Sequence, residues 1–320
     1  MIKYFKYFTL LFLIPLGHMA CKPKVVIKHD GEKDRISFKS VFGISYTEVS
    51  RRLNNGLSFN SDGYQLEPSW QMKFVSDDSL ALYSPAKKAF INFPIGRGYD
   101  SIFYVARSFF RVKKITPDSI LLQLIQAKAD SIDLRGSNVY MTFYADEFIR
   151  NVIRKETATL KAPSNKDTMF VKGLINVAER DISKAFFARL PATVKSNSIL
   201  ADVHRHIISG DVLYNYHADE DYMYPTYNIV LKRCKSNFYY SFSAIVDSHG
   251  KLHYEKPLIP TTSTFYISHS KAVLKDYLQK LLTVTPGSTL GLIHPSTLYF
   301  HVKGQSVKSV RKNYHGFISK

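Results

Sequence analysis

The residues with the clearest capacity for chemistry lie in the short segment 202–206. Asp202, His204 and His206 alternate along the chain, and alternate residues of a β-strand point to the same face. His217 and Asp219 follow within one loop length. Two imidazoles and a carboxylate are suitable ligands for an open zinc site, so this group predicts a candidate metal centre. The alternative to a metal site is a polar, exposed strand, because short His-x-His patterns arise by chance in a chain with 11 histidines.

The second candidate is a thiol. Cys234 lies in the sequence Lys232-Arg233-Cys234-Lys235, and neighbouring cations can lower a thiol pKa and make it reactive. No base is identifiable beside it in the sequence. We therefore expect a structural strand cysteine without a chemical role.

An α+β layer positions these groups. Residues 211–304 read as β-β-β-α-β-β, with strands over 227–231, 238–246, 251–254, 290–293 and 298–302 and a helix over 270–282. The turn at 247–250 and the Pro286-Gly287 stop mark where elements end. The candidate metal ligands at 202–206 precede this domain, in a segment (161–210) that we interpret as a linker with a helix at 170–190.

The part of the chain from 36 to 160 is predicted to be β-rich. Short apolar runs recur at spacings of about ten residues, separated by turn residues, which is typical of an antiparallel sheet curled into a sandwich or partial barrel. Two helices interrupt the pattern, one over 47–55 and one over 145–160. The fold class is therefore α+β and β-rich, with a basic tail over 305–320.

The first 21 residues have the pattern of a secretory signal. Lys3 and Lys6 precede an apolar run over 7–16, too short for a spanning helix, and Ala20-Cys21 follows. This segment resembles the signal of bacterial lipoproteins, although His18 departs from the family's usual small or aliphatic residue. The resemblance implies removal of 1–20, lipid attachment at Cys21, and a tether over 21–35. A cleaved, unlipidated form and an uncleaved anchor are the alternatives.

The C-terminal layer is similar to the C-terminal domain of TonB-type energy transducers. The matching residues are Tyr224-Pro225, Val246-Asp247, Gly250-Lys251, the helix 270–282, Pro286-Gly287 and the strand 298–302. The resemblance implies binding of a partner segment by β-strand addition. The family's membrane helix and proline-rich span are not seen before this domain, so energy transduction is not part of this expectation.

Composition narrows the partners. The formal net charge is +18, which favours anionic lipid or anionic envelope polymers. No helix or stripe concentrates that charge as in a groove binder, so we expect no nucleic acid and no cofactor. The sequence predicts a non-enzymatic binding or scaffolding protein, anchored to the bacterial cell envelope through Cys21. The alternatives are a metal-dependent hydrolase using His204 and His206 and a TonB-like partner-binding module.

Overall fold

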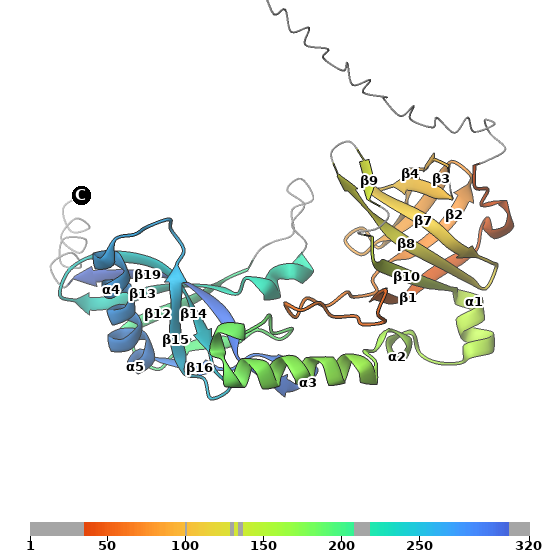
Figure 1. Ribbon diagram of the computed structural model, residues 1–320. Helices are drawn as coiled ribbons and strands as arrows, with labels where there is room; N and C mark the ends of the chain where they lie inside the picture. Colours follow the sequence, from red (N-terminus) through yellow and green to blue (C-terminus); the bar gives the residue numbers. More distant parts are fainter. Residues whose placement is uncertain (1–34, 100, 129–130, 134–136, 208–217, 307–320) are drawn as a thin grey trace, which may run out of the picture.

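A computed structural model describes residues 35–99, 101–128, 131–133, 137–207 and 218–306. It contains two β-rich modules, a barrel module (β1–β10) and a C-terminal module (β11–β19 with α4 and α5), joined by a helical connector. In Figure 1 the barrel lies at the right, the C-terminal module at the left, and helix α3 runs between them. The predicted β-rich α+β class is confirmed.

The barrel module consists of one sheet in which every neighbouring pair is antiparallel. A short 3-10 turn, η2 (Lys39–Val41), precedes it. Its strands are β1 (Ser45–Leu53), β2 (Gln71–Ser76), β3 (Ser79–Ser84), β4 (Ala89–Pro94), β5 (Gly96–Arg97), β6 (Ile102–Val105), β7 (Ser108–Ile115), β8 (Ser119–Lys128), β9 (Ser131–Asp133) and β10 (Val139–Ala145).

The order of the strands curls this sheet almost into a closed barrel. It runs β4-β3-β2-β1-β10-β8-β7-β6-β5, with β9 paired to β8, so the two edge strands are consecutive in the chain. Arg97 in β5 reaches across to the β2–β3 turn, where its guanidinium lies 3.2 Å from Asp78 and 3.7 Å from Asp77. Of the predicted alternatives, a sandwich or a partial barrel, the structure has the partial barrel, and this ion pair ties its edge strand β5 to the β2–β3 turn.

Aromatic side chains fill the barrel. Phe38 stacks on Phe74 with ring centroids 4.1 Å apart, and Phe103 stacks on Phe110 at 5.3 Å. All four rings are buried. The periodic apolar residues of the sequence therefore point inward, as a period of two requires.

The helix predicted over 47–55 is wrong, because these residues form strand β1. Tyr46 and Val49 are buried, and β1 pairs with both β2 and β10. A β-bulge between Glu48 and Ser50 inserts an extra residue into the ladder. The bulge breaks the period-two pattern that would have revealed a strand in the sequence.

Helices connect the two modules. They are α1 (Asp146–Phe148), the π-turn η3 (Ile149–Ile153), α2 (Thr157–Lys161), α3 (Asn165–Arg180) and the 3-10 turn η4 (Ile182–Lys184). The single helix predicted over 145–160 is broken at Arg154, whose φ of 55° is left-handed. Helix α3 begins with a capping box in which Ser164 and Asp167 satisfy each other's backbone N–H groups.

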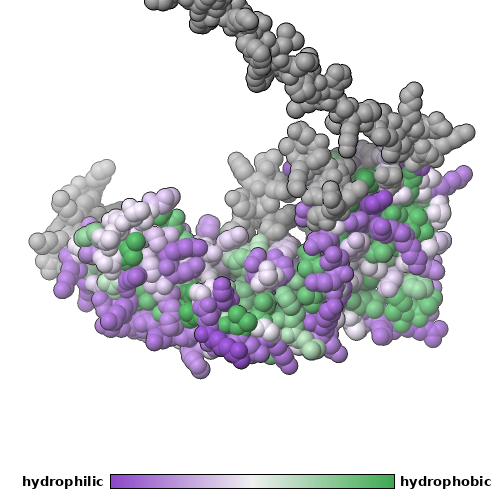
Figure 2. All heavy atoms as spheres, viewed as in Figure 1, coloured by the Kyte–Doolittle hydropathy of each residue, from purple (hydrophilic) through white to green (hydrophobic). Residues whose placement is uncertain are grey.

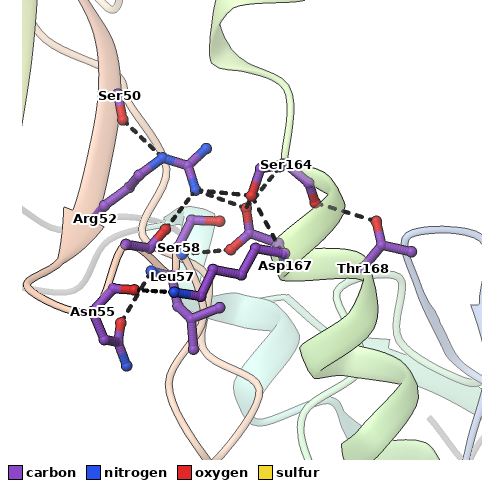
Figure 3. Close-up of polar contacts among 10 residues, drawn as sticks. Ser50, Arg52, Asn55, Leu57, Ser58, Ser164, Asp167 and Thr168 are labelled. Atoms are coloured by element: carbon purple, nitrogen blue, oxygen red, sulfur yellow. Dashed lines mark hydrogen bonds and ion pairs between the residues drawn. The ribbon is translucent and has the colours of Figure 1, made fainter.

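Asp167 also fastens α3 to the barrel module (Figure 3). Its carboxylate accepts hydrogen bonds from the Ser58 backbone N–H at 2.6 Å, from Ser164, and from the Arg52 guanidinium at 2.8 Å. Burial raises the pKa of this carboxyl, but the hydrogen bonds from Ser58, Ser164 and Arg52 outweigh it and lower the pKa to about 2. Asp167 is therefore a fully buried carboxylate that accepts hydrogen bonds from three residues, one of which, Arg52, carries the opposite charge.

A third hydrophobic core, the junction core, lies where the connector meets both modules. Its buried members are Phe59, from the loop after β1, Val171 and Ala178 from α3, and Phe186. The hairpin of β17 (Ser288–Thr289) and β18 (Leu292–Ile293) adds Leu290 and Leu292. Segments from the beginning, middle and end of the chain thus share one core.

His294 is buried beside the junction core. Its ring stacks on Phe186 at 3.9 Å, its Nδ1 donates to the Pro295 carbonyl at 2.9 Å, and its Nε2 accepts from the Thr289 hydroxyl at 2.9 Å. Burial lowers the pKa of His294, and the hydrogen bond to Pro295 and the charge of Glu179 oppose this only in part. Folding therefore favours the neutral form of this imidazole.

This neutral histidine predicts a loss of stability in mild acid. In the unfolded chain the imidazole takes up a proton near pH 6.5, whereas in the folded chain it does so only at a lower pH. The stabilisation is therefore complete above pH 6.5 and is lost as the pH falls below it. We expect a slope of at most about 1.4 kcal/mol per pH unit. Urea unfolding at about pH 7.5 and about pH 5.5 should show a larger loss in the wild type than in His294→Gln. Equal losses in both proteins would contradict the assignment.

The C-terminal module is built on a five-stranded sheet in the order β12-β13-β19-β14-β15. Strands β13 and β19 are parallel, and the other neighbours are antiparallel. The strands are β11 (Thr193–Ser196), β12 (Ala201–His206), β13 (Thr226–Cys234), β14 (Phe238–Val246), β15 (Leu252–Pro257), β16 (Leu282–Thr285) and β19 (Ser296–Ser306); strand β11 pairs with β16 outside the main sheet.

One continuous helical segment covers the inner face of this sheet. It comprises α4 (Thr264–Val273), the π-turn η6 (Leu274–Leu278) and α5 (Gln279–Leu281). Val273, Leu274 and Leu278 pack there against the buried residues of β13, β14 and β19. The predicted α+β layer is present, and it also includes β12, which lies before residue 211.

Backbone strain at Arg233 predicts a stabilising substitution. This exposed residue has a φ of 58° and lies at the irregularity between Leu231 and Cys234 in the β13–β19 ladder. Glycine adopts this conformation without the side-chain clash, so Arg233→Gly should raise the free energy of unfolding by about 0.5–1 kcal/mol. Lys172→Gly, in the exposed interior of α3, removes the same charge and should instead cost about 1 kcal/mol. Thermal unfolding of both variants measures whether each substitution raises or lowers the free energy of unfolding. Destabilisation by Arg233→Gly would show that the backbone is not strained at this residue.

Candidate binding face

The face of the C-terminal sheet opposite the helices carries polar and aromatic side chains; we call it the outer face. Its register places His204, Asn228, His301 and Ser241 in one row across β12, β13, β19 and β14. Neighbouring residues on these strands, such as Ile229 and Phe300, are buried on the helical side. The alternation of strand side chains thus gives the sheet one apolar face that packs against the helices and one face with polar and aromatic side chains.

The best-fixed side chain of the outer face is His301. Its Nδ1 shares a hydrogen bond of 2.8 Å with the Ser241 hydroxyl, and its ring lies parallel to Tyr239 at a centroid distance of 6.4 Å. Burial lowers the pKa of His301, and the nearby His206 lowers it further. Around neutral pH this face therefore offers a neutral, oriented imidazole beside an aromatic ring.

Tyrosines extend the outer face in the next row. Tyr299 follows Thr226 and His206 in the register, and its ring lies 5.8 Å from Tyr224. Tyr224 in turn approaches Phe187 at 6.1 Å. Tyr239 is 60% exposed and Tyr224 is 49% exposed, so the rings are accessible to a partner.

The structure places Asp202, His204 and His206 on one strand of this face, β12. The Asp202 carboxylate pairs with the Lys232 ammonium at 2.7 Å, while His204 and His206 are exposed. Among the residues that the structure describes, no three His, Cys, Asp or Glu side chains are grouped to hold a metal ion. His217 and the side chain of Asp219, in η5 (Ala218–Met223), lie outside the described residues, so the five-residue site stays a prediction.

Three members of the outer face were missed by reasoning from the sequence: His301, Tyr299 and Tyr239. A signal for the first two exists in β19, where Tyr299, His301 and Lys303 alternate with Leu298, Phe300 and Val302. A period of two with polar residues on one side is typical of a half-exposed strand. The parallel pairing of β19 with β13, which sets His301 beside Asn228, has no such local signal.

Of the two cysteines, only Cys234 is described. It is buried at the end of β13, its Sγ lies 3.6 Å from the Leu231 carbonyl oxygen, and burial raises the pKa of its thiol. A raised pKa keeps the thiol protonated and inert, in agreement with a structural cysteine. Cys21 lies outside the described residues.

The described helices include none that is long and apolar enough to cross a membrane. A comparison with protein-family models and with curated proteins finds no match to this chain.

Proposed function

We propose that this chain is a bacterial envelope protein, anchored by a lipid on Cys21, that binds a partner through its outer face and catalyses no reaction. The observation that carries the proposal is the outer face itself, where accessible tyrosines surround an imidazole held in place by Ser241. Tyrosine supplies large contact area together with a hydrogen-bonding group, and it is enriched in interface hot spots.

The charges on the outer face support binding. Lys232 is neutralised by Asp202, whereas Lys303 is exposed and no ion pair is formed by it within the described part of the chain. The His301 imidazole, the tyrosine hydroxyls and the Asn228 amide offer both donors and acceptors of hydrogen bonds. Such a surface suits an envelope protein or an anionic envelope polymer.

Edge strands offer a second mode of binding. Strands β12 and β15 are the outermost strands of this sheet in the described residues. A partner segment that added a strand to β12 would lie next to His204 and His206, and it would use the mode implied by the resemblance to TonB-type domains. We propose this mode as the TonB-like alternative.

The hydrolase alternative rests on the histidines. His204 and His206 lie on the same side of β12, and the register places His301 two strands away from His204 on the outer face. Zinc at a near-stoichiometric level in the purified protein, with hydrolysis lost on chelation, would favour this alternative over pure binding.

Site-specific photo-crosslinking in intact cells tests the binding proposal. A photoreactive residue at Asn228, exposed at the centre of the outer face, should give a discrete adduct. The matched control is Phe265, which is 65% exposed on α4, in the helical layer on the other side of the sheet. Adducts at neither position, or equal adducts at both, would contradict the proposal.

A further inference from the structure

The outer surface of the barrel module carries an apolar hollow at β5, β6 and β7. Hydrophobic residues gather in patches on the barrel in the space-filling view (Figure 2). This hollow has a volume of about 320 Å³. Its outward-facing lining consists of Gly96, Gly98, Tyr99, Ile102, Tyr104 and Phe109.

The rings in the hollow are accessible. Tyr104 and Phe109 lie opposite each other in the β6–β7 ladder, with centroids 4.8 Å apart. Tyr99 is 41% exposed and Tyr104 is 39% exposed. Accessible tyrosine rings are enriched at the interface between the apolar core of a membrane and water.

Cations border the rings. Arg111 pairs with Ile102 in the ladder and points to the same side of β7 as Phe109, and Arg107 lies at the β6–β7 turn. Neither guanidinium forms an ion pair within the described residues, and Lys113 and Lys114 are exposed farther along β7. Guanidinium groups that form no ion pair with another described residue and lie beside an apolar hollow match a ligand with phosphate and acyl parts.

The chain enters the barrel next to this hollow. The Arg97 guanidinium donates to the Ile36 carbonyl at 3.3 Å, and Arg97 directly follows Gly96 of the hollow. Residues 22–35, the chain between Ile36 and the cysteine, can reach at most roughly 50 Å. A lipid on Cys21 would therefore keep the barrel within this distance of the membrane.

We infer that the β5–β7 surface contacts an anionic lipid bilayer, with Tyr104 and Phe109 at the acyl boundary and Arg107 and Arg111 on lipid phosphates. The inference rests on the proposed lipid anchor and specifies how the anchored barrel is oriented. An acyl anchor together with a basic, aromatic surface provides the two signals that stable peripheral attachment requires.

Fluorescence quenching in vesicles tests the orientation. Tyr104→Trp and the matched control Tyr239→Trp, each in the full lipidated chain, are reconstituted with phosphatidylglycerol vesicles that contain brominated acyl chains. The native Trp70 is the same background in both proteins. We expect Tyr104→Trp to be quenched and blue-shifted and Tyr239→Trp to be unaffected. Phe109→Trp provides a second reporter in the same hollow, and Arg111→Glu should reduce the quenching several-fold.

The outcomes separate the inference from the anchor. If the protein floats with the vesicles but the tryptophans at positions 104 and 109 emit as they do without vesicles, the proposed orientation is wrong and the lipid anchor stands. Equal quenching in phosphatidylcholine vesicles overturns the assignment to anionic lipid. If the wild-type protein does not float with vesicles of either composition, both the inference and the proposed anchor fail.

Discussion

Replacing Phe59 with alanine should lower the free energy of unfolding by about 3–5 kcal/mol, because it empties the centre of the junction core. Phe59 is fully buried and packs with Val171, Ala178 and Phe186. The loop that carries it belongs to the barrel, whereas its neighbours belong to the connector. We therefore expect the variant to lose cooperativity as well as stability, with the two modules unfolding in separate transitions.

Urea denaturation followed by two probes measures this effect. Trp70 fluorescence reports on the barrel, and far-UV circular dichroism reports on the whole chain. Phe90→Ala is the matched control, since Phe90 is 45% exposed on β4 and its removal should cost far less. Coincident transitions and a small loss in Phe59→Ala would show that the junction core does not couple the modules.

The second large effect is expected at Asp167. Asp167→Asn keeps the shape of the side chain but removes the charge that faces Arg52. The substitution leaves the Arg52 guanidinium, which is 26% exposed, without its partner charge, so we expect a loss of up to about 3 kcal/mol. Because the pKa of Asp167 is lowered from 3.8 to about 2, its stabilisation is complete above about pH 4 and is lost as the pH falls toward 2.

The matched control for Asp167 is Asp181, which caps the short turn η4 beyond the other end of α3. Hydrogen bonds from Ser183 lower the pKa of Asp181 too, but this carboxylate is exposed. Asparagine is an equally good cap, so Asp181→Asn should change stability little. Equal effects of the two substitutions in chemical denaturation would show that burial and Arg52 contribute nothing.

Much of the fold follows from local patterns in the sequence. Strands β13, β14 and β15 and the helical layer were predicted near their observed bounds, because apolar alternation and turn residues mark them clearly. A sandwich or partial barrel was also expected, since most of its strand pairs are consecutive in the chain; the pairing of β1 with β10 is the long-range exception. These elements depend on short-range signals that a single sequence contains.

The errors have physical causes. The bulge after Glu48 concealed β1, and the left-handed Arg154 divides what read as one helix. The junction core joins Phe59 to Leu290 across most of the chain, and nothing in the local sequence indicates that contact. Long-range packing of this kind decides how the modules are held together.

The candidate site was found only in part. The shared face of His204 and His206 follows from strand alternation, but the parallel pairing of β13 with β19 supplies His301 and Tyr299 from the far end of the domain. The outer face is therefore a product of topology.

The most direct test compares wild type with Cys21→Ser in a bacterial host that attaches lipid to secreted proteins. We expect the wild-type protein in the membrane fraction, with a mass that lacks residues 1–20 and includes a diacylglycerol group on Cys21. Cys21→Ser should remain folded but leave the membrane fraction. A Cys21→Ser protein of unchanged apparent size that stays with the membrane would contradict the lipid anchor.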